Sequence, residues 1–139
     1  MSDEKKFVRV RFSPGETGWG REIETGRVII ANIPLTDALN IDDLVEVDTT
    51  PRKGAIEIVR VLKRVFECKT AVDYPVPHKE NYAKIREAWH AAGMKCEGMI
   101  PGLVIIAHHE NQNPVQLAID AGVAAALHPT QPDLEPVPA

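Results

Sequence analysis

The 139-residue chain is poor in cysteine and in aromatic side chains, and both shortages narrow the choice of protein classes. Its only two cysteines are Cys68 and Cys96, and no CxxC pair occurs, so the sequence predicts neither a disulfide scaffold nor a thiolate zinc site. Aromatic residues make up 5% of the chain, which predicts a core built mainly from aliphatic side chains. We therefore expect two buried free thiols in an aliphatic interior.

Long apolar stretches and clustered positive charge are missing as well. No run approaches the ~20 apolar residues of a membrane-spanning helix, and the N-terminal residues MSDEKKF contain no apolar signal region. This predicts a cytoplasmic protein without a membrane partner. The formal net charge of -4 argues against a nucleic-acid partner, because phosphate binding is driven by clustered lysine and arginine.

Motifs for catalysis or cofactor binding are also absent. Residues 13–18 lack both the P-loop lysine and the GxGxxG spacing, and neither a GxSxG nucleophile elbow nor an HExxH zinc motif occurs. We therefore expect no cofactor and no resident metal, and the sequence favours a function other than catalysis.

Short alternating segments dominate the first part of the chain. Residues 7–12 alternate between apolar and arginine side chains, which is typical of a half-buried strand. Trp19 falls in a glycine-containing segment that we expect to be a loop, where its ring would plug the edge of a core. The pattern predicts a small all-β, barrel-like unit over residues 1–54. Its further strands are expected at residues 22–25, 28–33 and 44–48.

Strand and helix patterns alternate over residues 55–128. The expected strands are residues 55–64, 65–74, 94–97 and 103–108, and the expected helices are residues 78–92 and 115–127. From residue 65 the order is β-α-β-β-α, a ferredoxin-like unit without its last strand. We expect strand 55–64 to fill that edge.

These patterns together predict an α+β protein in which the barrel-like unit packs on the ferredoxin-like half. A strand shared between the two halves would make them one intertwined folding unit. Residues 129–139 are rich in proline, which predicts an irregular tail.

Two stretches resemble known families. In residues 26–48, Ile33-Pro34 is followed by Leu39, Asp43, Val45 and Val47, and this pattern resembles the AbrB-type swapped hairpin. The resemblance implies dimerisation and DNA binding, but Asp42 stands where that family has glycine. The acidic residues of this segment argue against DNA binding; they are Asp37, Asp42, Asp43, Glu46 and Asp48.

A broader resemblance covers most of the chain. It rests on the β-α-β-β-α order and on Val8-Arg9-Val10-Arg11-Phe12, Glu22, Asn32-Ile33-Pro34 and Asp43-Leu44-Val45. The chain resembles an uncharacterised bacterial family, classed as a domain of unknown function, that pairs an N-terminal β unit with a ferredoxin-like half. This resemblance implies a fold but no activity.

Polar side chains follow two strands that we expect to be parallel neighbours, residues 65–74 and 103–108. Ligands commonly bind beyond the carboxyl ends of parallel strands, where histidine and carboxylate can shuttle protons or hold a divalent metal. The alternative is that these residues only cap strand ends and loops. Adjacent His108 and His109 point to opposite faces, so at most one enters a given site. The candidate polar cluster comprises Asp73, Tyr74, His78, His108, His109 and Glu110.

A second candidate surface is basic, and a solvated sheet face is its simpler interpretation. It comprises Arg9, Arg11, Arg60, Arg64 and Lys69.

Three functions therefore stay open. The favoured one is a non-enzymatic binding or regulatory protein that contacts a protein partner through exposed strand edges, with homodimerisation as the simplest case. The second is a metal-dependent or acid/base enzyme or sensor that uses the polar cluster. The third, a nucleic-acid-binding regulator that uses the basic surface, fits the acidic net charge least well.

Overall fold

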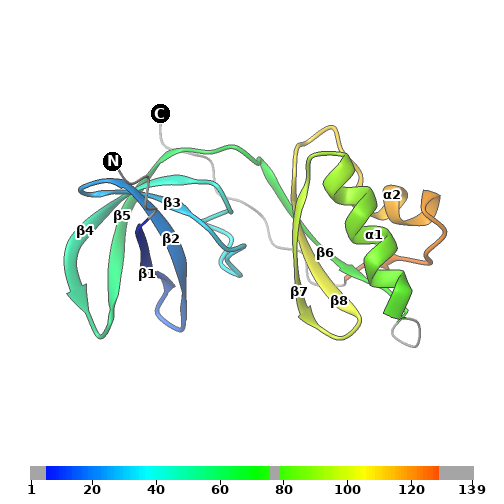
Figure 1. Cartoon of the computed structure of the whole chain (residues 1–139), viewed down its shortest axis with the longest axis horizontal. Helices are drawn as coiled ribbons and strands as arrows, with labels where there is room; N and C mark the ends of the chain where they lie inside the picture. Colours follow the sequence, from blue (N-terminus) through cyan, green and yellow to red (C-terminus); the bar gives the residue numbers. More distant parts are fainter. Residues whose placement is uncertain (1–5, 76–78, 129–139) are drawn as a thin grey trace. The chain divides into compact units, whose positions relative to one another are not determined.

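The computed structural model describes residues 6–75 and 79–128, which contain strands and two helices, as expected for an α+β protein (Figure 1). The chain divides into two compact units, one ending at Phe66 and the next beginning at Glu67. The boundary expected after residue 54 is wrong, because the strand that follows it pairs entirely within the first unit.

The first unit is a five-stranded barrel whose neighbouring strands follow one another along the chain. Its strands are β1 (Lys6–Ser13), β2 (Glu16–Glu24), β3 (Arg27–Ile30), β4 (Leu44–Arg52) and β5 (Ala55–Lys63). Successive strands are antiparallel, and β5 returns parallel to β1. The β3–β4 pairing lies within residues 26–48, so the segment that resembles an AbrB-type hairpin pairs its two strands inside one chain.

An aliphatic core fills the barrel, with Val10, Val28 and Val45 completely buried. Gly20 faces this core, where an added Cβ atom would be 2.2 Å from Cγ1 of Val28, so any side chain at this position would force its neighbours to shift. Trp19 does not lie in a loop or plug the edge of the core, as was expected. It lies on β2 and is 44% exposed, because residues on either side of it, not Trp19 itself, face the core.

The second unit is a four-stranded sheet with two helices, and its strand order is β7-β8-β6-β9. Its elements are β6 (Cys68–Asp73), α1 (Lys79–Ala91), β7 (Lys95–Ile100), β8 (Leu103–His108), α2 (Pro114–Asp120) and β9 (Ala126–Leu127). All neighbouring strands of this sheet are antiparallel.

The last helix and the last strand differ from the expectation. The helix expected over residues 115–127 ends at Asp120, and Gly122 follows with a φ of 91°, a conformation that suits glycine and breaks the helix. The short strand β9 then pairs with β6, so the edge expected for residues 55–64 is filled from the other end of the chain. Within the described residues, β5 belongs to the barrel alone and is not shared with the second sheet.

Trp89 lies at the centre of the second unit's core. It is completely buried with Ile85 and Ile106, and its indole N–H donates a 2.9 Å hydrogen bond to the carbonyl oxygen of Pro114. The helix that begins at Pro114 is capped by Asn113, whose side chain accepts from the backbone N–H of Gln116, as expected from the Asn-Pro pair. Within the described ranges, no helix is long and apolar enough to cross a membrane.

Candidate functional site

The polar cluster expected at the strand ends does not converge. Strands β6 and β8 are antiparallel, with Cys68 opposite His108 and Asp73 opposite Leu103. The expectation of parallel strands was wrong, because the β7–β8 hairpin reverses the chain before it reaches β6. Asp73 and His108 are thus five residues apart along the sheet, about 16 Å at ~3.3 Å per residue. His78 lies outside the described residues.

Four of the five described members of the cluster contact separate partners instead. Asp73 Oδ1 lies 3.0 Å from Nδ1 of His128, and the ring of Tyr74 lies 5.7 Å from that of Tyr82. His109 Nδ1 lies 2.8 Å from a carboxylate oxygen of Glu67. These pairs stabilise strand ends and do not share a common centre.

His108 is buried, and its side chain forms hydrogen bonds within the second unit. Burial lowers the pKa of this imidazole, which favours the neutral ring. In that form Nδ1–H donates to the carbonyl oxygen of His109 at 2.8 Å, and Nε2 accepts from the Thr70 hydroxyl at 2.7 Å. Glu110 is exposed at the end of this segment. Among residues 6–75 and 79–128, no three side chains of His, Cys, Asp or Glu gather as metal ligands.

The five residues of the expected basic surface do not form one surface either. Lys69 belongs to the second unit and is only 4% exposed, whereas the four arginines belong to the barrel. Arg11, Arg60 and Arg64 line a groove in the barrel, and Arg9 lies outside it.

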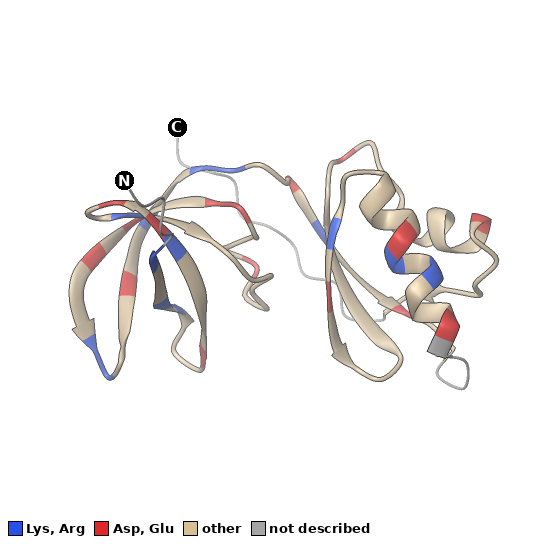
Figure 2. Ribbon diagram, viewed as in Figure 1, with Lys and Arg blue, Asp and Glu red and all other residues tan. Residues whose placement is uncertain are grey.

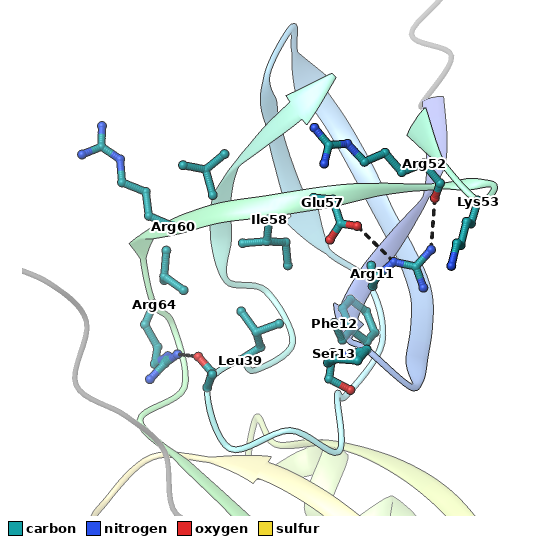
Figure 3. A pocket seen from close by; sticks show the side chains of 14 residues that line it. Arg11, Phe12, Ser13, Leu39, Arg52, Lys53, Glu57, Ile58, Arg60 and Arg64 are labelled. Atoms are coloured by element: carbon teal, nitrogen blue, oxygen red, sulfur yellow. Dashed lines mark hydrogen bonds and ion pairs between the residues drawn. The ribbon is translucent and has the colours of Figure 1, made fainter. Parts of the chain in front are cut away.

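This β1–β5 groove has a volume of about 790 Å³ and runs along β5 (Figure 3). It is bordered by the end of β1, the β4–β5 turn and the loop that contains Leu39. Its lining residues are Arg11, Phe12, Ser13, Pro14, Ala38, Leu39, Arg52, Lys53, Glu57, Ile58, Val59, Arg60, Val61 and Arg64.

The groove exists because β1 and β5 pair over a very short distance. Val10 pairs with Ile56 and Arg11 with Glu57, and within the described residues β5 has no strand partner on that side beyond this point. On its other side, β5 has a bulge at Val59, which has no partner in β4 and is 59% exposed. The barrel therefore leaves one edge of β5 open along the groove.

Apolar side chains form the inner part of the groove. Phe12 and Leu39 are buried members of the barrel core, and Ile58 and Val61 are packed against it. Figure 3 shows Phe12, Leu39 and Ile58 around this region. An occupant would therefore meet aliphatic and aromatic surface beside an open strand edge.

Cations line the outer part of the groove, and most of them are already paired. Arg11 Nε lies 3.2 Å from Glu57 Oε1, and Arg60 Nε lies 3.2 Å from Glu46 Oε1. Figure 2 shows basic and acidic positions interspersed along these strands. Lys53, in the β4–β5 turn, has no ion pair in the part of the chain that the structure describes. The groove is thus mildly basic, and its exposed cations lie at the rim.

Arg64 forms a buried ion pair at one end of the groove. Its guanidinium binds the completely buried Asp43, with Nε 3.1 Å from Oδ1 and Nη2 3.0 Å from Oδ2, and Nη2 also donates to the Ala38 carbonyl at 2.9 Å. Asp43 Oδ2 accepts from the backbone N–H of Asn40 at 2.8 Å, and the Asn40 amide donates to the carbonyl of Phe66 at 3.1 Å. This network holds the loop that forms one wall.

Sequence reasoning found three of the groove's cations but missed the groove itself. Leu39 was noted only as part of the AbrB-type pattern, and the bulge at Val59 is a property of strand pairing that no local pattern reveals.

Comparisons with known proteins add little to this geometry. No protein-family model and no curated protein matches the chain. Among solved structures, the chain is similar to a hypothetical protein from Neisseria gonorrhoeae, at 15% sequence identity and a TM-score of 0.47, over 97% of this chain and 100% of that chain. The description of that protein names neither a ligand nor an activity.

Proposed function

We propose that the chain is a non-enzymatic binding protein that holds an extended peptide segment of a partner protein in the β1–β5 groove. The observation that carries this proposal is the open edge of β5 beyond Glu57, which runs along the groove. An extended peptide that adds to such an edge gains main-chain hydrogen bonds, and pockets for its alternate side chains supply the specificity.

The charges of the groove favour a peptide over a small, highly charged anion. Arg11, Arg60 and Arg64 each contact a carboxylate of the chain, so their positive charge is already largely compensated. A phosphate-binding site needs several cations that converge on one point. Here the paired cations are spread along a strand instead, which suits a linear ligand.

The preferred peptide alternates apolar and acidic side chains. Because successive side chains of a strand point to opposite faces, one set would contact the apolar surface at Phe12 and Leu39. The other set would face the rim, where Lys53 offers positive charge and the 61%-exposed guanidinium of Arg60 offers hydrogen-bond donors beside its pair with Glu46.

For the second unit, we propose a ferredoxin-like classification. Its order of elements, β-α-β-β-α-β, and its antiparallel strand order β7-β8-β6-β9 support this assignment.

Selection of linear peptides displayed on phage tests the main proposal with the full chain. We expect enrichment of alternating apolar and acidic sequences, whose binding is then measured by calorimetry. Val59→Pro removes a backbone N–H at a bulge that has no β4 partner, and should weaken binding at least tenfold, whereas Val59→Ala keeps the N–H and should bind far better.

Charge reversal gives a second, matched comparison. Arg60→Glu should weaken binding of the selected peptides several-fold. Arg27→Glu is the control, because Arg27 is also an exposed barrel arginine with one carboxylate partner but does not line the groove. If no peptide is enriched, or if Val59→Pro and Arg60→Glu bind as well as the wild type, the proposal is wrong. Self-association of the free chain in sedimentation would identify a second copy as the occupant instead.

A further inference from the structure

A second surface of the barrel combines exposed aromatic rings with arginines, away from the groove lining. On neighbouring strands, Arg9 of β1 pairs with Trp19 of β2, and Phe7 pairs with Arg21. Directly opposite residues of an antiparallel pair share a face. Val8, which lies between Phe7 and Arg9 along β1, packs against the barrel core, and Val10, the next residue on that inner face, is completely buried. These four residues, called here the stacking face, therefore lie together on the outside of the barrel.

The two aromatic rings of the stacking face are unusually exposed. Phe7 is 54% exposed and Trp19 is 44% exposed, in a chain with few aromatic residues. The guanidinium of Arg9 lies over the indole of Trp19, 4.7 Å from the ring centroid. This cation–π contact holds a flat, positively charged platform in place before any ligand arrives.

The arginines of the stacking face differ from the other described arginines of the barrel. Those others each have a carboxylate partner, at 3.0–3.7 Å; they are Arg11, Arg27, Arg52, Arg60 and Arg64. Within the described residues, neither Arg9 nor Arg21 has such a partner. Among the described residues, two arginines without a carboxylate partner therefore flank two exposed rings.

We propose that the stacking face binds single-stranded nucleic acid. Bases would stack on Phe7 and on the Arg9–Trp19 pair, and phosphates would contact Arg9 and Arg21. Base stacking on aromatic side chains combined with cations along the backbone is the general mode of sequence-tolerant single-strand binding. The unpaired guanidiniums favour a polyanion over a neutral partner, and exposed rings favour unstacked bases over a duplex. The acidic net charge of the chain limits the footprint to this local site.

Fluorescence anisotropy with a labelled 12-nucleotide oligo-dT, at 50 and 200 mM salt, tests the proposal on the full chain. We expect binding at 50 mM salt that weakens at 200 mM, and weaker binding of a 12-base-pair duplex. Phe7→Ala and Trp19→Ala should each reduce affinity about tenfold, as expected for one lost stacking contact. Arg21→Gln should make the negative slope of log K against log salt shallower by about 0.7, as expected for one lost phosphate contact.

Two controls separate this site from a general charge effect and from the groove. Arg27→Gln removes a charge of the same barrel that is already paired with Glu24, and should leave the affinity unchanged. Val59→Pro alters the groove and should also leave it unchanged, so failure of the peptide proposal would not affect this result. Circular dichroism checks that each variant is folded.

Three results would overturn the inference. The first is no binding of oligo-dT at 50 mM salt. The second is binding that Trp19→Ala and Arg21→Gln leave intact. The third concerns the peptides selected for the β1–β5 groove: Trp19→Ala abolishes their binding, whereas Val59→Pro does not. The stacking face would then be a protein interface.

Discussion

The barrel unit and the second unit both bury polar side chains, but the interactions that stabilise them differ. In the barrel, the buried Asp43 binds Arg64, whose side chain is 9% exposed, so the pair is charged on both sides. In the second unit, the buried Trp89 and His108 are held by hydrogen bonds to Pro114, Thr70 and the neighbouring backbone. Across the described residues, every buried side-chain nitrogen and oxygen has a partner.

This difference relates stability to the proposed function. The charged pair in the barrel holds the loop that forms a wall of the β1–β5 groove, so a change in charge should affect both folding and binding. The second unit depends on a packed aromatic side chain between sheet and helices, so a change in volume should affect folding alone. Variants of each kind can separate the two units experimentally.

The largest effect is expected for Trp89→Ala. Truncation of this completely buried side chain leaves a cavity and removes the hydrogen bond to the Pro114 carbonyl, and should reduce the free energy of unfolding by about 4 kcal/mol. Urea unfolding followed by circular dichroism measures the loss. In this variant, fluorescence from Trp19 alone reports on the barrel. If the Trp19 transition moves to lower urea by the same amount, the two units do not unfold separately.

Asp43→Ala should have the next largest effect. It leaves the Arg64 guanidinium buried without its carboxylate, which costs about 3 kcal/mol of barrel stability. The double variant Asp43→Ala, Arg64→Met removes both charges and should recover part of the loss. Urea unfolding followed by circular dichroism measures the wild type and both variants, and a double variant less stable than Asp43→Ala would argue against the buried-charge explanation.

Two glycines of the barrel provide a smaller, matched test. A Cβ atom at Gly20 would lie 2.2 Å from the buried Val28, whereas one at Gly15 would meet no atom within 4 Å. Gly20→Ala should therefore cost about 2 kcal/mol through overpacking. Gly15→Ala should change stability by less than about 0.5 kcal/mol, as is usual at a surface position. Equal midpoints for the two variants would show that β2 can move away from Val28.

Local sequence patterns predicted an element well where a buried apolar run defines a strand or where a glycine ends a helix. The apolar run Leu103–His108 is a strand as expected, and the helix Lys79–Ala91 ends before Gly93, which has a φ of 83°. Pairing between distant segments was harder to predict. The apolar and β-branched composition of the strand Ala55–Lys63 would suit the barrel or the second unit equally well. Only its pairing with β4 and β1 assigns it to the barrel.

The candidate sites show the same limit more sharply. Arg9, Arg11, Arg60 and Arg64 were chosen as one basic surface from sequence alone, but Arg9 lies on the stacking face and Arg64 in a buried pair. Which carboxylate neutralises which arginine depends on strand register and on a bulge, and neither is encoded in a short pattern. The sequence therefore identified these positive charges, but neither the unit that holds each of them nor the difference between paired and unpaired arginines.

The smallest expected effect concerns pH and the second unit. Burial lowers the pKa of His108 from its ordinary value of 6.5, with smaller opposing contributions from the His109 carbonyl and from Glu67. Below pH 6.5 the unfolded chain therefore binds more protons at this residue than the folded chain does. The contribution of neutral His108 to the free energy of unfolding is complete above pH 6.5. This contribution is lost as the pH falls toward the lowered pKa of the folded state.

Urea unfolding of the second unit at pH 5.5 and 7.5 measures this contribution. The wild type should be less stable at pH 5.5, and His108→Gln should reduce the difference between the two pH values, because glutamine does not titrate. His90→Gln, at an exposed position on α1, should keep the full difference. The pKa of Glu67 is lowered from 4.5 by its hydrogen bond to His109, so this carboxylate titrates below the chosen range. An unchanged difference in His108→Gln would show that the buried imidazole is not the group that makes the second unit sensitive to acid.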